Sequence, residues 1–250
     1  TAEKILRTFN FAFAQDQKTA KRLLSLGMPR EILLGISSLK EQAEPLTFDS
    51  NEFKKLKENF SDRKIWVAGS THLGEEEILL RAQQILYNYD KKYLLILVPR
   101  HPERGETIAN NLISSGRRVV RRSLKDKISS DTEIYVADTM GELGLWYKLS
   151  DIAFLGGSLV NVGGHNPYEP CRFGTAILHG SFVYNFQHIF DLLNSEGASI
   201  LVEDSLSIVN QIKALTQSGG AQKIGLKGMK IVNGLSDKSK SMVKVINSFI

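Results

Sequence analysis

From residue 63 onward, short apolar runs alternate with amphipathic segments, and this alternation constrains the fold more than any other feature of the chain. Runs such as 65–68, 93–98 and 152–155 are predicted to be buried strands, because their apolar residues follow one another without polar interruption. Segments with helical periodicity lie between them. This alternation predicts right-handed crossovers and a Rossmann-like α/β fold built on a doubly wound parallel sheet.

The predicted elements form a regular series after residue 63. Strands are expected at 65–68, 93–98, 118–121, 133–137, 152–155, 175–178 and 199–202, and helices at 75–89, 105–115, 141–149, 205–217, 220–233 and 237–249. Earlier in the chain, a helix at 15–26, a short strand at 32–36 and a helix at 51–60 are expected. The polar stretch 41–62 reads as a linker into a new domain, so we divide the chain into 1–45 and 46–250. The ordered pattern close to Thr1 suggests a piece of a longer protein.

Polar clusters follow several predicted strands. They occupy residues 69–75, 99–104, 138–142 and 156–169. In doubly wound sheets the ligand crevice lies beyond the carboxyl ends of the strands. We therefore expect these four clusters to converge on one edge of the sheet.

The glycine-rich segment after the strand at 152–155 is the most informative of these clusters. Gly163 and Gly164 supply bare backbone amides in front of a predicted helix start, which is a favourable place for an anion. His165 and Asn166 add side-chain donors, and Glu169 can accept hydrogen bonds from hydroxyls. Amides for a phosphate beside a carboxylate for a sugar predict a site for a nucleotide sugar.

The cluster after the first strand of the sheet has two interpretations. Ser70 and Thr71 can cap the following helix, and Glu76 and Glu77 suit the positive end of that helix. Capping alone does not require the histidine at position 72, so Ser70, Thr71 and His72 are also candidates for ligand contact.

The two remaining clusters are basic and acidic, respectively. Arg100 and His101 stand directly at a strand end, where they can meet a ligand, although a solvated basic turn is the alternative. Arg104 fits either a phosphate or a surface salt bridge equally well. Asp138 and Thr139 can cap the next helix, and the loop at Met140 and Gly141 can contact a base edge.

Several functional classes are disfavoured by what the sequence lacks. The net charge of +5 is compatible with anionic ligands, and the single cysteine excludes an internal disulfide. No apolar run is long enough to span a bilayer. The five histidines lack metal-ligand spacing, and Walker, nicotinamide and hydrolase signatures are missing. We expect no metal, no cofactor and no nucleic-acid partner.

Four motifs in order resemble the 3-deoxy-D-manno-octulosonic acid (Kdo) transferases of lipopolysaccharide synthesis. They lie at 66–76, 99–104, 137–144 and 156–170. The resemblance implies the two-domain GT-B glycosyltransferase fold, with residues 1–45 as the tail of the acceptor domain and linker and 46–250 as the donor domain. It also implies inverting, metal-independent transfer of Kdo from CMP-Kdo to a lipid A precursor. The full-length protein would act at the cytoplasmic face of the bacterial inner membrane.

The resemblance also assigns roles, which remain expectations at this stage. The general-base glutamate belongs to the family's acceptor domain and lies outside these residues, so the chain alone is expected to be inactive. The donor phosphate is assigned to His101, Gly163, Gly164, His165 and Asn166, the ribose to Glu169, the donor sugar or phosphate to Arg100, Ser70 and Thr71, and the nucleotide loop to Met140 and Gly141. The alternatives are another GT-B sugar-nucleotide enzyme, such as a UDP-sugar transferase or epimerase, and a non-catalytic nucleotide-binding module.

Overall fold

The computed structural model describes residues 2–15, 17–36 and 45–247. The chain divides into two compact units, one of residues 1–44 together with 231–250 and the other of residues 45–230. The expected boundary at residues 45–46 lies at the start of the larger unit. Residues 231–250, which were expected in the 46–250 domain, group instead with the N-terminal unit.

The N-terminal unit contains a small parallel sheet with short helices. Its elements are α1 (Ala2–Leu6), β1 (Ala12–Ala14), α2 (Gln17–Ser25), the 3-10 helix η1 (Arg30–Ile32) and β2 (Leu33–Ile36). β1 pairs in parallel with β2, and α2 packs against both strands. The predicted helix at 15–26 and strand at 32–36 correspond to α2 and β2.

The last helix is longer than the sequence suggested. α10 runs without a break from Gly220 to Asn247, whereas two helices at 220–233 and 237–249 were expected. The expected break falls next to Gly234, but one interior glycine costs a helix only about 1 kcal/mol. That cost is too small to end a helix on its own, so the prediction of two helices was wrong.

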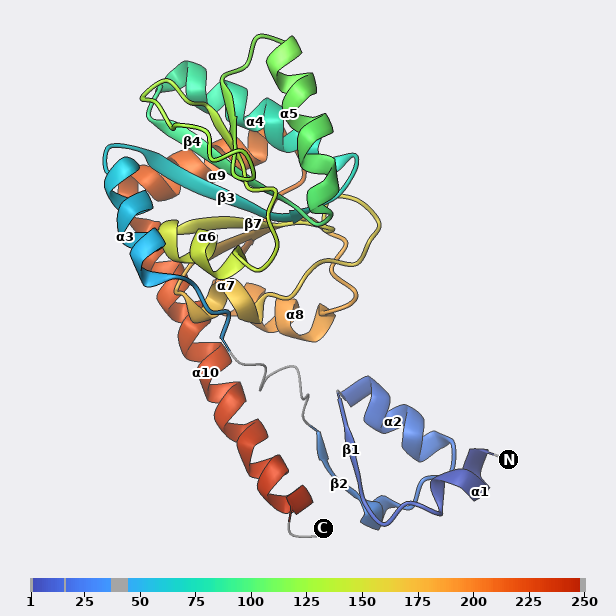
Figure 1. Ribbon diagram of the computed structural model, residues 1–250. Helices are drawn as coiled ribbons and strands as arrows, with labels where there is room; N and C mark the ends of the chain where they lie inside the picture. The colour runs from blue at the N-terminus through green and yellow to red at the C-terminus, as the bar shows by residue number, and fades with distance from the viewer. Residues whose placement is uncertain (1, 16, 37–44, 248–250) are drawn as a thin grey trace. The chain divides into compact units, whose positions relative to one another are not determined.

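The larger unit consists of strands and helices in alternation (Figure 1). Its elements are α3 (Ser50–Asn59), β3 (Lys64–Thr71), α4 (Glu75–Tyr89), β4 (Tyr93–Pro99), the 3-10 helix η3 (Pro102–Arg104), α5 (Gly105–Ser114), β5 (Val119–Arg121), β6 (Ile134–Val136), α6 (Leu143–Leu149), β7 (Ile152–Leu155), α7 (Tyr168–Arg172), β8 (Ala176–His179), α8 (Gln187–Ser195), β9 (Ser199–Leu201) and α9 (Ser205–Ser218). Of these, α8 had not been predicted.

Seven strands form one parallel sheet in the order β5-β6-β4-β3-β7-β8-β9. The chain proceeds outward from β3 through β4 toward β5 and β6, then returns to the other side of β3 and proceeds from β7 to β9. The direction of winding therefore reverses between β3 and β7, which is the switch point where doubly wound folds bind ligands. The predicted fold class is confirmed.

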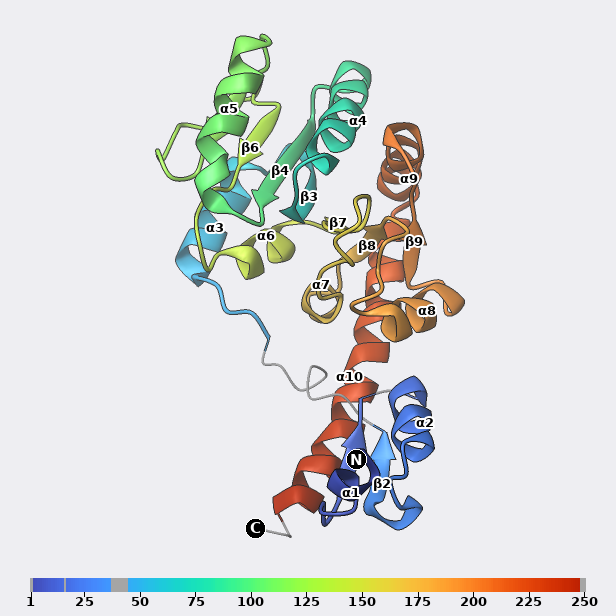
Figure 2. The same ribbon diagram turned by 90° about the vertical axis from the view of Figure 1, so that its right-hand side faces the viewer.

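Helices cover both faces of the sheet (Figures 1 and 2). α4, α5 and α9 pack on one face, where Trp66, Leu95 and Phe154 belong to the main buried cluster. α3, α6, α7 and α8 lie on the other face. Strands buried on both sides account for the continuous apolar runs in the sequence.

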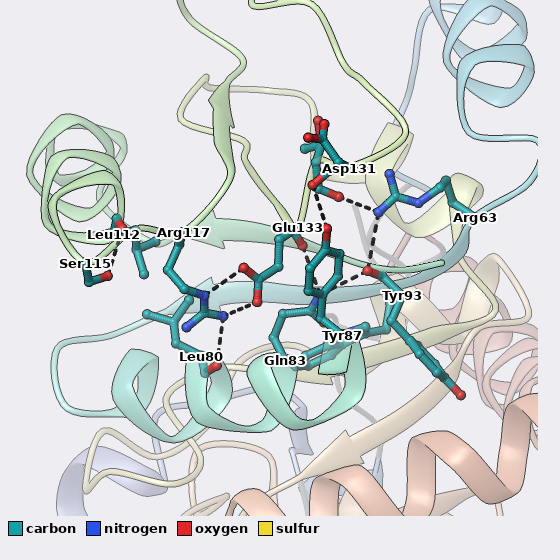
Figure 3. A network of polar contacts seen from close by, with 12 residues as sticks. Arg63, Leu80, Gln83, Tyr87, Tyr93, Leu112, Ser115, Arg117, Asp131 and Glu133 are labelled. Carbon is teal, nitrogen blue, oxygen red and sulfur yellow. Dashed lines mark hydrogen bonds and ion pairs between the residues drawn. The ribbon is translucent and has the colours of Figure 1, made fainter. Parts of the chain in front are cut away.

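A buried polar network fixes α4 to the strands beside it (Figure 3). The Gln83 side chain donates to the carbonyls of Tyr93 (3.1 Å) and Glu133 (2.9 Å) and accepts from the Trp66 indole (2.7 Å). Arg117 binds the Glu133 carboxylate through two nitrogens, at 2.8 and 2.5 Å. Because the buried side chains of Gln83, Trp66 and Glu133 all have hydrogen-bond partners, this network holds α4 at one position along the sheet.

Candidate functional site

The loops that follow β3 and β7 meet at the switch point between these strands. The amide of Gly156 donates to the carbonyl of Gly69 (2.9 Å), and a Cβ on Gly156 would lie 2.1 Å from the Ser70 carbonyl oxygen. Position 156 therefore requires glycine. Ser70 has a φ of 58°, in the left-handed region that costs a non-glycine residue energy. Such strain is concentrated at functional sites.

A buried carboxylate ties the two loops together. Glu75 is fully buried, and its oxygens accept from the amides of Gly157 (2.7 Å), Ser158 (2.9 Å) and Leu159 (2.9 Å). It also accepts from the amide of His72 (3.1 Å). One side chain at the start of α4 thus sets the position of the glycine-rich loop and of the loop that carries His72.

Two histidines, one from each loop, form a direct hydrogen bond. The Nε2 atoms of His72 and His165 are 2.8 Å apart, and the ring planes differ by only 9° with centroids 5.1 Å apart. Ring faces cannot approach closer than about 3.5 Å, so these rings meet edge to edge in nearly one plane. One Nε2 must therefore donate its proton while the other accepts it.

Arg100 and His101 extend this pair from the end of β4. The His101 ring lies across the His72 ring, with centroids 6.3 Å apart and planes at 85°. The positive charge of Arg100 lies close enough to lower the pKa of His72, His165 and Glu169. The charge of Arg100, after β4, thus acts on residues of the loops after β3 and β7.

Glu169 is the acceptor on the other side of this group. Asn166 holds it through a hydrogen bond from Nδ2 to Oε1 (3.2 Å), and the Asn166 Oδ1 accepts from the amide of Tyr168 (3.1 Å). Burial raises the pKa of the Glu169 carboxyl, although the bond from Asn166 and the charges of Arg172 and Arg100 oppose the rise. The carboxylate is held in place and only partly hydrated, which suits it to bind a hydroxyl.

Both imidazoles of the pair favour the neutral form. Burial, His72 and Arg100 lower the pKa of His165 to about 4. Burial also lowers the pKa of His72, with smaller contributions from His101 and Arg100, and Glu75 opposes this. Without a ligand the pair is therefore uncharged near pH 7.

No family model matches the chain, but comparisons with individual known proteins identify its relatives. Over 181 residues it is 40% identical to a 3-deoxy-D-manno-octulosonic acid transferase of Haemophilus influenzae, covering 72% of this chain and 42% of that protein. It is 33% identical to the solved C-terminal CMP-Kdo binding domain of WaaA from Acinetobacter baumannii, with a TM-score of 0.68, covering 73% of this chain and 96% of that domain. The chain belongs to the Kdo transferase family.

These matches cover only part of each full-length relative. The chain spans less than half the length of the curated Kdo transferases that it matches first. A UDP-GlcNAc 2-epimerase of Neisseria meningitidis is similar at a TM-score of 0.61 but only 14% identical, over 97% of this chain and 62% of that protein, so it shares the fold alone. Among the described residues, none of the helices has the length and apolar character needed to cross a membrane. Within the same residues, no cluster of three potential metal ligands is found.

Most of the predicted site residues of this family member do lie together. The residues gathered at the carboxyl edge around β3 and β7 are Ser70, Arg100, His101, His165, Asn166 and Glu169. His72, a candidate from its sequence cluster, stands among them. The role of Glu75 in holding the two loops was not predicted. The run of three glutamates indicated only a position at the positive end of α4.

The glycine amides behave differently from the expectation. Gly163 and Gly164 both donate to the carbonyl of Gly157, at 3.1 and 2.8 Å, so in this structure their amides are already used. The helix that follows, α7, has only five residues, which leaves little dipole to attract an anion. These glycines instead have φ values of 105° and 76°, and so they shape the loop that carries His165.

The prediction that Ser70 or Thr71 caps α4 was wrong. The residue before α4 is Gly74, whereas the hydroxyl of buried Thr71 donates to Glu76 (3.1 Å). Arg104 binds the same Glu76 carboxylate, at 2.8 and 2.5 Å. Thr71 and Arg104 therefore both bind Glu76 in α4, and the salt bridge accounts for Arg104.

Asp138 was also expected to cap a helix and does not. Its buried carboxylate accepts from the Arg121 guanidinium (2.9 Å) and from the amide and hydroxyl of Ser123 (2.9 and 2.8 Å), while Glu142 precedes α6. Asp138 packs closely against the start of α5, because a Cβ on Gly105 would lie 2.2 Å from the Cβ of Asp138. The glycine at the start of α5 makes room for this aspartate.

The nucleotide loop stands apart from the histidine group in the described contacts. Met140 is 74% exposed and borders a pocket of about 850 Å³ that also includes Arg122, Tyr135 and Glu142. Gly141 has a φ of 80° and open space at its Cα. This pocket contains none of the other predicted site residues.

Proposed function

We propose that residues 45–230 bind CMP-Kdo and that the protein transfers Kdo from this donor to a lipid A precursor, with inversion and without a metal. The observation that carries the proposal is the position of Arg100 at the switch point of the sheet, where its charge acts on His72, on His165 and on the carboxylate of Glu169. Three cationic or donor groups suit a phosphate, and the carboxylate of Glu169, four residues after His165, suits ribose hydroxyls. The solved relative from Acinetobacter baumannii is itself a CMP-Kdo binding domain.

The chemistry of transfer explains why such donors are needed. The phosphate of CMP-Kdo carries one negative charge while it is bonded to the sugar and two once CMP has left. Preorganised donors that meet this developing charge lower the barrier most, especially in a partly water-excluded site. Arg100, His101 and the His72–His165 pair are the groups placed to do so.

Roles follow from position within the site. We assign the phosphate to His101, His165 and Asn166, and the phosphate or the Kdo carboxylate to Arg100. Glu169 accepts from the ribose hydroxyls, and Ser70 contacts the donor sugar or phosphate from the end of β3. The backbone at Met140 and Gly141 meets the base edge in the bound state.

The remainder of the reaction is assigned to the part of the family's proteins that the chain does not match. We infer that the general-base glutamate and the lipid acceptor site belong to the N-terminal domain of the full-length transferase. Action at the cytoplasmic face of the inner membrane follows from the lipid acceptor. The 250-residue chain is then expected to bind CMP without transferring Kdo.

Titration calorimetry with CMP, UMP and UDP tests the donor assignment. CMP should bind at least tenfold more tightly than UDP, whereas a clear preference for UDP would overturn the proposal in favour of a UDP-sugar enzyme. Glu169→Gln and His101→Ala should each weaken CMP binding about tenfold, equal to one lost hydrogen bond of about 1.4 kcal/mol. Unchanged CMP affinity in both variants would refute the assignment of the donor site to these residues.

Stability gives Glu169→Gln an independent signature. The folded-state pKa of Glu169 is raised, so the folded protein favours the protonated form, and the favourable contribution is lost as pH rises through that pKa. The neutral variant should therefore melt at a higher temperature than the wild type at pH 7, with a difference that shrinks toward pH 4. His101 is exposed, and its variant should melt like the wild type.

A further inference from the structure

We propose that His72 and His165 act as one proton-sharing unit in the phosphate subsite, and that binding of the CMP phosphate draws one proton into this unit. The inference rests on the proposed donor site and deepens it. It assigns to His72 a positioning role, because His72 sets which nitrogen of His165 carries a proton.

The geometry fixes what the neutral pair can offer. A single proton lies between the two Nε2 atoms, which are 2.8 Å apart. The ring that donates this proton keeps a lone pair on its Nδ1, and the ring that accepts it carries a proton on its Nδ1. Neither Nδ1 has a hydrogen-bond partner among the described residues. The neutral pair thus presents one donor and one acceptor.

A phosphate dianion needs donors only. The acceptor nitrogen of the neutral pair would face it with a lone pair, which is unfavourable. One added proton converts that nitrogen into a donor and gives the pair a positive charge, while the Nε2–Nε2 bond stays in place. Phosphate binding and proton uptake must therefore favour each other, because linkage is reciprocal.

The charged groups around the pair keep this proton away until the anion arrives. Arg100 and His101 from the end of β4, together with Arg104 in η3, disfavour a charge on His72, and only Glu75 on α4 favours it. Arg100 and His72 disfavour a charge on His165. Glu75 is already held by four backbone amides, so most of its charge is used elsewhere. Among the described residues, Glu75 is the one carboxylate whose charge acts on His72, and none acts on His165. A bound phosphate would therefore supply the negative charge that the pair lacks.

Proton NMR of the histidine ring signals tests the inference directly. The chain has five histidines, and His72→Gln and His165→Gln assign the two signals of the pair. With saturating CMP these signals should titrate at least one pH unit higher than in the free protein. Cytidine, which lacks the phosphate, should leave them unchanged.

Affinity measurements across pH separate proton sharing from a structural role. Glutamine can replace the hydrogen bond of His72 but cannot take up a proton. His72→Gln should weaken CMP binding by less than twofold at pH 9, where the wild-type pair stays neutral, and by more at pH 6.5. The loss should grow further as pH falls, up to about tenfold for each unit by which the phosphate raises the pKa of the pair. His188→Gln on α8, outside the group, should reproduce the wild-type pH dependence.

The outcomes distinguish the inference from the proposed function. If CMP binds but both ring signals titrate at the same pH with and without it, proton uptake is refuted and the donor site stands. An equal loss of affinity for His72→Gln at pH 6.5 and pH 9 would likewise leave His72 as a structural residue only. If CMP does not bind at all, the donor site itself fails.

Discussion

At the residue scale, Ser70 shows most clearly how function and stability conflict in this chain. Its left-handed backbone places the end of β3 against the glycine-rich loop, where Gly156 has no room for a side chain. Glycine would adopt this conformation without strain. The serine hydroxyl is therefore kept at a cost, and donor contact is the reason we propose for keeping it.

Ser70→Gly should raise the free energy of unfolding by up to about 1 kcal/mol, because it removes the left-handed penalty. The same change should weaken CMP binding about tenfold through loss of the hydroxyl. Urea unfolding and calorimetry measure the two effects. Lys125, with a φ of 55°, is a matched control for the stability effect, and Lys125→Gly should raise stability similarly. A loss of stability in Ser70→Gly alone would show that the strain is absent or is offset by other contacts.

Residue identity predicted side-chain chemistry better than side-chain partners. Histidine, arginine and carboxylate at strand ends were sufficient to predict His101, His165 and Glu169 at one edge. The pairing of Arg104 with Glu76 and of Arg121 with Asp138 was not predictable, because the two partners are 28 and 17 residues apart, respectively, and do not share an element. Only the folded sheet brings those residues together.

At the element scale, α4 serves the site through its first residue and through its interior. Its first residue, Glu75, organises the loops, and the network around Gln83 fixes the helix on the sheet. Helix periodicity gave the bounds of α4 correctly, because seven buried positions recur on one face. The same periodicity could not show that Glu75 is buried, since three successive glutamates look alike in sequence.

Gln83→Ala should lower the free energy of unfolding by about 1–3 kcal/mol, since it leaves the buried Trp66 indole without its hydrogen-bond acceptor and removes one donor from each of the carbonyls of Tyr93 and Glu133. Gln84 is the next residue and is exposed, so Gln84→Ala should change stability by less than about 0.5 kcal/mol. Thermal unfolding of both variants checks this. CMP affinity should stay at the wild-type value in folded Gln83→Ala, because the network lies at the opposite ends of the strands. Equal stability of the two variants would show that the network contributes nothing.

At the scale of the whole molecule, the winding of the sheet was the most predictable property. Alternating apolar runs and helices specify a doubly wound parallel sheet almost regardless of detail. Where the chain divides was less predictable, since the second half of α10 groups with residues 1–44. Local sequence carries no signal for which distant segment a long polar helix contacts.

A ligand at the switch point should connect the two halves of the sheet. Binding at 100 times the dissociation constant stabilises the folded state by about 2.7 kcal/mol, and the protection should concentrate where the ligand sits. In hydrogen exchange, CMP should slow the amides of 70–76, which follow β3, and of 156–169, which follow β7, to a similar degree. Cytidine should protect neither segment to the same extent, because the shared contacts are to the phosphate. Protection confined to the loop at Met140 and the nearby Arg122 would place the nucleotide in the other pocket and would contradict a phosphate site at the switch point.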